Sequence, residues 1–174
     1  FGGVEFVVPT IASMGLNPHA CLRFTTQNLS DTIQTYAQNM EASGHFAKIG
    51  FVEMGKPGVM AAMEMTKVLR NKEVLFTVFD EETDYSAEVE LFGKKVLGGA
   101  GLDKLLKFAN TPTKAFNVFM IRTSATTYKM ELREIDLEAG NPIQQMYTHL
   151  ENVLKDHLTQ WYFLHEEVPF AESN

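Results

Sequence analysis

One carboxylate and two glycines stand close together in Phe1-Gly2-Gly3-Val4-Glu5, just before the apolar run Phe6–Ile11. Gly2 and Gly3 permit a tight turn and the close approach of another group. Glu5 precedes an expected helix, where the helix dipole favours a negative charge by about 0.3–1 kcal/mol. In a second interpretation Glu5 is half of a catalytic pair whose base lies immediately before Phe1. The rest of the chain must decide between these roles.

Further charged groups stand where apolar strands are expected to end. The densest acidic cluster is Asp80-Glu81-Glu82-Thr83-Asp84. Its carboxylates suit Mg²⁺ or Ca²⁺, or the cluster is a solvated loop. Arg23 and Arg122 each close an apolar run. In open α/β sheets ligands bind beyond the carboxyl ends of the strands, and a planar guanidinium suits phosphate or carboxylate.

The sequence offers no nucleophile placed beside a base. The single cysteine, Cys21, lies in an apolar run and is expected to be a buried core thiol, which favours a reducing compartment. None of the histidines has a partner at catalytic spacing, so a surface or structural role is expected for them: His19, His45, His149, His157 and His165. A group transfer by this chain would therefore proceed in one step, without a covalent enzyme intermediate.

Helix and strand patterns alternate along the 174 residues. Helices are expected over Glu5–Met14, from a Ser30-Asp31 cap to Ala42, and over Val59–Arg70, Leu102–Asn110 and Asn141–His157. Strands are expected over Ala20–Phe24, Ala47–Val52, Val74–Phe79, Glu88–Gly93, Ala115–Ile121 and Tyr128–Ile135. This order predicts a single α/β domain over residues 1–174, with a mostly parallel central sheet flanked by helices.

The net charge of −7 argues against a nucleic-acid partner. Eight basic and two acidic residues lie between Lys94 and Arg133, so this segment carries +6 and the remainder −13. It is either a set of solvated faces or a landing site for an anionic partner. No stretch has the roughly 18 uninterrupted apolar residues of a membrane span.

Several of these segments, in order over nearly the whole chain, resemble one family. The sequence is similar to the lauroyl/myristoyl acyltransferases of lipid A biosynthesis, within the lysophospholipid/glycerolipid acyltransferase superfamily. Phe1–Glu5 resembles the family motif His-x4-Asp/Glu without its His. The other matching positions are Arg23, helix Val59–Arg70 with strand Val74–Phe79, the acidic segment at Asp80, Phe92-Gly93, Gly98–Gly101, Arg122 and Gln160–His165.

The resemblance implies a three-layer acyltransferase fold, with the chain cut between the catalytic His and Glu5. It implies transfer of a fatty acyl group from an acyl-carrier-protein or CoA thioester to a hydroxyl or amine of a lipid or glycolipid acceptor. Glu5 would orient the base, and Asp80 would position the acceptor head group or loops of the site. The implied substrate-binding residues are Gly2, Gly3, Arg23, Asp80, Glu81, Glu82, Phe92, Gly93, Arg122 and His165. The basic residues Lys94, Lys95, Lys104 and Lys107 would receive the carrier. No metal or other cofactor is implied.

The resemblance also implies a bacterial protein on the cytoplasmic side of the inner membrane, peripheral to it or anchored by a segment outside residues 1–174. Two departures from the family pattern weaken the prediction of a lipid A acceptor more than the prediction of acyl transfer. Glu166-Glu167 replaces a family Arg-Arg, and Glu81 replaces a Gln. Two other interpretations stay open. One is a non-catalytic module that binds a lipid or an acyl carrier. The other is a metal-dependent hydrolase that uses the Asp80–Asp84 cluster.

Overall fold

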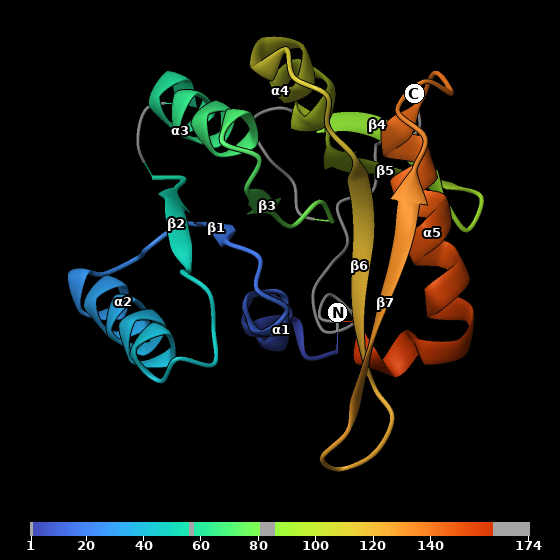
Figure 1. The fold of residues 1–174 in the computed structure, drawn as a ribbon. Helices are drawn as coiled ribbons and strands as arrows, with labels where there is room; N and C mark the ends of the chain where they lie inside the picture. The colour runs from blue at the N-terminus through green and yellow to red at the C-terminus, as the bar shows by residue number, and fades with distance from the viewer. Residues whose placement is uncertain (1, 56–57, 81–85, 162–174) are drawn as a thin grey trace. The chain divides into compact units, whose positions relative to one another are not determined.

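The computed structural model describes residues 2–55, 58–80 and 86–161, and it is a mixed α/β structure (Figure 1). The chain divides into two compact units. The first unit comprises Phe1–Val4, Phe79–Lys104 and Pro112–Asn174, and the second comprises Glu5–Val78 and Leu105–Thr111. Because each unit joins stretches that are distant in sequence, the expected single domain stays a prediction.

The second unit contains the parallel sheet. Its strands are β1 (Pro18–Leu22), β2 (Gly50–Glu53) and β3 (Val74–Phe76), in the order β2-β1-β3. Both neighbours run parallel to β1, with Ala20 opposite Phe51 on one side and Phe76 on the other. Helices α2 (Gln27–Ala42) and α3 (Gly58–Arg70) make the crossovers that parallel strands require. The expected parallel sheet is confirmed here.

Helix α1 (Val7–Ser13), preceded by the 3₁₀ turn η1 (Val4–Phe6), packs on this sheet. Near its carboxyl end, the Ala12 carbonyl accepts a hydrogen bond from the Ala47 N–H, which lies before β2. Nearer its start, Val8 packs in the same cluster as Phe51, which lies within β2. The helix therefore runs antiparallel to the strands, and its amino end faces the side of the sheet where the strands end.

The first unit is antiparallel. Strands β4 (Ser86–Leu91) and β5 (Lys94–Gly99) form one hairpin, and β6 (Ala115–Arg122) and β7 (Tyr128–Ile135) form another. Connections of a few residues can join only antiparallel neighbours. Among the described strands, the parallel arrangement is thus confined to the second unit, and the predicted mostly parallel sheet is confirmed only in part.

Helix α5 (Pro142–His157), followed by the 3₁₀ turn η2 (Leu158–Gln160), lies along the β6–β7 hairpin (Figure 1). Its buried face packs with both hairpins, and the cluster includes Phe119, Leu150, Leu154 and Trp161, each at most 8% exposed. As expected, Asn141 caps the helix, because its side chain accepts a hydrogen bond from the Gln144 N–H at 3.0 Å.

Several boundaries differ from expectation. Thr26 caps α2, not Ser30, because the Thr26 hydroxyl accepts the Leu29 N–H at 3.2 Å. The helix expected over Leu102–Asn110 is α4 (Gly101–Ala109), but Gly98 and Gly99, which precede it, end the strand β5. At Gly98 the Tyr147 ring occupies the space of a side chain, since an added Cβ would lie 2.5 Å from it. Gly98 is therefore explained by its close packing against Tyr147, whereas the resemblance placed this glycine at the start of a helix.

Candidate functional site

The two glycines of the opening motif are fixed to two distant segments of the first unit. The Gly2 N–H donates to the Gln160 carbonyl at 2.7 Å, and the Gly3 N–H donates to the Met120 carbonyl at 3.1 Å. Gly2 has a φ of +57°, and a Cβ there would lie 2.0 Å from the Met120 oxygen. Only glycine fits both the backbone conformation and this approach. The expected close approach is therefore an approach to the strand β6.

Gln160 continues this contact by binding the backbone of Arg122. Its side-chain oxygen accepts the Arg122 N–H at 2.8 Å, and its amide nitrogen donates to the Arg122 carbonyl at 3.1 Å. We call the group Gly2, Gly3, Met120, Arg122 and Gln160 the N-terminal junction. It joins the start of the chain, the end of β6 and the end of η2 through both backbone and side-chain hydrogen bonds.

The Arg122 side chain folds back on its own hairpin. Its guanidinium donates to the carbonyls of Ser124 at 3.0 Å and Ala125 at 2.7 Å, and it lies 6.0 Å from the centre of the Tyr128 ring. These bonds close the turn between β6 and β7. The residue stands at the end of its strand, as predicted, but part of its binding capacity is used within the hairpin. A role in binding substrate stays a prediction.

Asp80 is tied to the residue that follows Gln160. The indole N–H of Trp161 donates to an Asp80 carboxylate oxygen at 3.0 Å. Tyr147 lies nearby on α5 and donates its hydroxyl to the Phe79 carbonyl at 3.1 Å. Burial, and then the charge of Asp80, raise the pKa of Tyr147, so it stays a neutral donor. Asp80 thus holds the residue that follows η2, and its predicted role in substrate binding stays a prediction.

Glu5 and Arg23 belong to the second unit. Glu5 is exposed in η1, before α1, and Arg23 is exposed directly after β1. Because α1 runs antiparallel to the sheet, both residues lie on the side where the parallel strands end. This is the side where α/β sheets bind ligands. Their predicted roles in orienting a base and binding an anion stay predictions.

Phe92 and Gly93 form the two-residue turn between β4 and β5. Both have positive φ, +51° and +71°, which is the conformation that such tight hairpins require. The Phe92 N–H donates to a carboxylate oxygen of Glu151 on α5 at 2.9 Å. This bond, together with Lys155, holds the pKa of Glu151 below its usual range. The matched Phe-Gly pair therefore has a clear structural use, and its predicted substrate contact stays a prediction.

The four lysines expected to receive a carrier lie on two elements. Lys94 and Lys95 begin β5, and Lys95 pairs with Glu88 across the hairpin at 2.8 Å. Lys104 and Lys107 are exposed on α4, on opposite sides of the boundary between the units. Their expected joint contact with a carrier stays a prediction. Three predicted substrate-binding residues, Glu81, Glu82 and His165, lie outside the described residues.

Two histidines have partners that their sequence positions did not indicate. His19 on β1 lies 3.1 Å from Glu73, measured from Nε2 to a carboxylate oxygen. Both residues lie at the end of the sheet where β1 and β3 begin. A His–Glu pair thus occurs in the second unit, but at the edge opposite the one where such sheets bind ligands. The pairing favours a structural role, as expected for His19.

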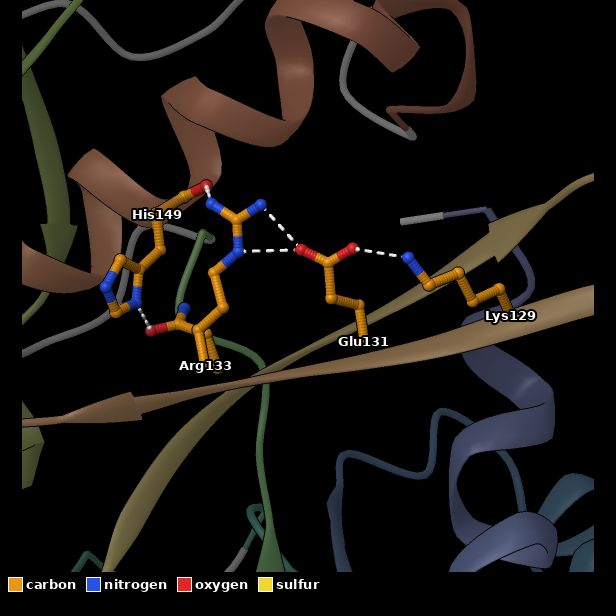
Figure 2. A network of polar contacts seen from close by, with 5 residues as sticks. Lys129, Glu131, Arg133 and His149 are labelled. Atoms are coloured by element: carbon orange, nitrogen blue, oxygen red, sulfur yellow. Dashed lines mark hydrogen bonds and ion pairs between the residues drawn. The ribbon is translucent and has the colours of Figure 1, made fainter.

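The second histidine, His149, belongs to a polar network between α5 and the β6–β7 hairpin (Figure 2). Its Nδ1 lies 3.3 Å from the Asn117 side-chain oxygen, and its carbonyl accepts from Arg133 at 3.3 Å. Arg133 also binds Glu131, which Lys129 contacts at 3.3 Å. Burial, and then the Arg133 charge, lower the pKa of His149. Bonds from Arg133 likewise lower the pKa of Glu131.

The residues of these contacts that the sequence did not assign to the site include Asn117, Gln160 and Trp161. Asn117 interrupts the apolar strand pattern, is 2% exposed, and has an Nδ2 group without a hydrogen-bond partner among the described residues. A polar residue at the centre of an apolar strand was the available signal. The sequence indicated Gln160 and Trp161 only as members of the segment Gln160–His165, which resembles the family.

Comparison with known proteins gives no assignment: no protein-family model matches this sequence, and no curated protein matches it. Within the described residues, none of the helices has the length and apolar character needed to cross a membrane. The same part of the chain contains no cluster of three or more His, Cys, Asp or Glu residues able to hold a metal ion. Of the acidic cluster Asp80–Asp84, only Asp80 is described.

Proposed function

We propose that the chain carries most of an acyltransferase site, which moves a fatty acyl group from a carrier-protein or CoA thioester to a hydroxyl or amine. The observation that supports this is the meeting of four separate segments in the first unit. Gly2-Gly3, Asp80, Arg122 and Gln160-Trp161 all occur in the resemblance to lipid A acyltransferases, and each contacts another of them. Such convergence is expected of positions that share one site.

In the proposed reaction a histidine immediately before Phe1 is the general base and Glu5 orients it. The histidine takes the proton of the acceptor hydroxyl, whose oxygen attacks the thioester carbonyl. The carbon–sulfur bond then breaks, and the departing thiolate takes the proton from the imidazolium. The carboxylate fixes the tautomer of the ring and stabilises its charged form, as in hydrolase triads. The acyl group ends on the acceptor and the thiol is released.

The state of Cys21 supports transfer in a single step. Burial raises the pKa of its thiol to about 12, against a smaller lowering by a hydrogen bond with Thr77. A thiol with this pKa is almost wholly protonated at neutral pH, and the thiolate is the nucleophile. The only cysteine of the chain is thus a poor candidate for carrying an acyl intermediate.

The proposal extends to partners and location. The donor is an acyl carrier protein or acyl-CoA, the acceptor is a lipid or glycolipid, and the protein works at the cytoplasmic face of a bacterial inner membrane. The basic segment Lys94–Arg133 supports an anionic donor, since its charge is opposite to that of the remainder. The three-layer glycerolipid acyltransferase fold belongs to the same proposal.

The direct test is turnover by the full-length protein, measured with labelled acyl carrier protein or acyl-CoA and an extract of lipid acceptors. Glu5→Ala should lower turnover by about 10²–10⁴. Glu41→Ala, which removes another exposed carboxylate from the second unit, should leave turnover unchanged. Exhaustive chelation should also have no effect, whereas loss of activity on chelation would favour the metal-dependent hydrolase.

The residue before Phe1 gives a second test. Any residue other than His in the full-length sequence would refute the catalytic proposal. Retained binding of an acyl carrier or lipid without turnover would then favour a binding module of the same fold. The free energy of unfolding of Glu5→Ala must also differ from that of the wild type by no more than the roughly 0.3–1 kcal/mol of a helix-dipole interaction. Lost turnover then does not reflect unfolding.

A further inference from the structure

Strand β7 has an edge that faces away from β6. The N–H and carbonyl of Arg122, at the end of β6, bind the Gln160 side chain and so point away from β7. Opposite residues of an antiparallel pair turn their backbone groups either toward each other or both outward. Tyr128 lies opposite Arg122, so its backbone groups point outward as well. The same holds for every second residue along the strand, namely Met130, Leu132 and Glu134.

One end of this edge is closed by α5. Asp136 follows β7 directly, and its N–H and carbonyl bind the Gln145 side chain at 3.0 Å and 2.8 Å. Its outward direction agrees with the alternation, and the contact ends the edge at this residue. Between Met130 and Glu134 no further strand lies beside β7 in the described ranges 2–55, 58–80 and 86–161. The open edge is thus short, and Leu132 stands at its centre.

The charged side chains of β7 lie on the face that packs with α5. Lys129, Glu131 and Arg133 project there (Figure 2), and Glu131 accepts hydrogen bonds from Lys129 at 3.3 Å and from Arg133 at 2.8 Å. Inward charges on an edge strand commonly oppose pairing with another chain. Here the signs alternate along the strand, so the charges oppose some registers of a second strand and favour others.

The charge pattern of β7 is complementary to itself in one antiparallel register. If a second copy of β7 pairs with Leu132 opposite its own counterpart, Glu131 faces Arg133 of the second copy, and Arg133 faces Glu131. Opposite charges directly across a strand pair are stabilising, and like charges are destabilising. Centring the pairing on Glu131 or on Arg133 would instead set like charges against each other.

The register centred on Leu132 also uses the whole open edge. Centring on Met130 would pair Lys129 with Glu131, but it would leave Glu134 without a neighbour. Leu132 itself is 52% exposed, on the face opposite α5. Pairing in this register brings the two copies of the side chain together and removes part of their apolar surface from water.

We propose that the protein forms a two-fold dimer in which the β7 strands of two copies pair antiparallel, with Leu132 opposite Leu132 of the second copy. The two hairpins form one continuous sheet, and the outward backbone groups along the open edge find partners. The ion pair between Glu131 and Arg133 extends across the interface. The proposal is independent of acyl transfer, since the N-terminal junction lies at the opposite edge of the hairpin, along β6.

Sedimentation velocity of the protein over about 1–200 µM tests the association, and the average mass should rise toward twice the monomer mass. Leu132→Pro removes an outward N–H that binds nothing in the hairpin, whereas Leu132→Ala keeps it. The proline variant should raise the dissociation constant at least about 10-fold above that of the alanine variant. A protein that stays monomeric overturns the proposal, whatever covers the edge instead. A dimer that the proline variant leaves unchanged also overturns it.

Cross-linking tests the register without a change to the backbone. Leu132→Cys places a thiol opposite its counterpart, with the Cα atoms about 5.5 Å apart, a separation that a disulfide can bridge. Glu134→Cys is the matched control, because this residue lies opposite Met130 of the second copy and away from its own counterpart. The wild type, whose only thiol is Cys21, gives the background. With oxidised glutathione, Leu132→Cys should form a covalent dimer at least about 10-fold faster than Glu134→Cys. Equal rates would contradict the register.

Discussion

The side-chain amide of Gln160 binds both backbone groups of Arg122, with hydrogen bonds of 2.8 Å and 3.1 Å. It thereby acts as a short piece of strand at the end of β6. The Gln160 carbonyl also receives the Gly2 N–H, so one residue fixes both the start of the chain and the end of the strand. The N-terminal junction explains why the opening glycines matter to the first unit, whatever chemistry follows them.

Replacing Gly2 by alanine should destabilise the protein more than the same change at Gly15. Both glycines have positive φ, +57° and +81°, so both variants place an L residue in a left-handed conformation that costs about 1–2 kcal/mol. At Gly2 the new Cβ would also lie 2.0 Å from the Met120 oxygen, whereas at Gly15 nothing lies within 4 Å. Urea unfolding of the two variants measures the difference. Equal destabilisation would contradict the close approach at the junction.

Asp80→Asn and Asp80→Leu should separate the structural role of Asp80 from a chemical one. Asparagine keeps an oxygen that can accept the Trp161 indole N–H, and leucine does not. The leucine variant should therefore lose about 1–3 kcal/mol of stability and shift the fluorescence of the only tryptophan, while the asparagine variant changes little. If Asp80→Asn is stable but loses acyl transfer, the negative charge itself serves the reaction. Equal stability of both variants would contradict the indole contact.

Stability should fall as the pH drops from about 7 to 5, and His149 should account for part of the loss. Burial and the neighbouring Arg133 lower its pKa in the folded protein, so the unfolded state binds the proton more readily. The neutral histidine therefore contributes stability above its ordinary pKa of 6.5, and that contribution is lost as the pH falls through 6.5 toward the folded pKa.

The measurement for His149 is the free energy of unfolding at pH 7 and pH 5, in the wild type and in His149→Gln. The variant cannot titrate, so its stability should depend less on pH over this range. Glu131 and Glu151, whose pKa values are lowered, lose their contribution only at more acidic pH, near and below the ordinary value of 4.5. The same slope in both proteins would show that His149 does not titrate differently on folding.

Cys21 should react slowly with thiol reagents in the folded protein. With a pKa of about 12, only a very small fraction is thiolate at pH 8, and the side chain is half-buried against the cluster of Val52, Ala61 and Val68. Modification by a chromogenic disulfide should therefore be slow in native buffer and fast in 6 M guanidinium chloride, on the order of the rate of a free cysteine. Rapid modification in native buffer would contradict the burial and reopen a covalent role for this thiol.

Local sequence signals predicted most element types, because the formation of a helix or a strand depends largely on residues that are close in sequence. The cap at Asn141, the strand Tyr128–Ile135 and the helix ending at Arg70 are all confirmed. Errors arose where two local signals competed. Ser30-Asp31 can cap a helix, yet Thr26 does so, because α2 begins earlier. Lys94–Gly99 lacks the usual strand residues at its end, and its pairing with β4 and its packing on Tyr147 make it a strand.

Whether neighbouring strands pair in parallel or antiparallel was harder to predict from the sequence than the element types. The alternation of helices and strands predicted a mostly parallel sheet, and β1, β2 and β3 follow it. The segments 86–99 and 115–135 contain successive strands without a helix between them, and this order forms hairpins. For the candidate site, sequence spacing indicated strand ends at Arg23 and Arg122, but it carried no information on which carbonyls the Arg122 guanidinium would bind.

By itself the sequence determined the α/β character, the cap at Asn141 and the resemblance that suggests acyl transfer, since all of these depend on residue types at short spacing. Only the tertiary structure decided that Gly2 meets Met120, that Gln160 binds Arg122 and that Trp161 binds Asp80. These partners lie tens of residues apart, and no local rule selects one distant hydrogen-bond group over another. The selection is made when β6 and α5 pack together and leave specific polar groups facing one another at the junction.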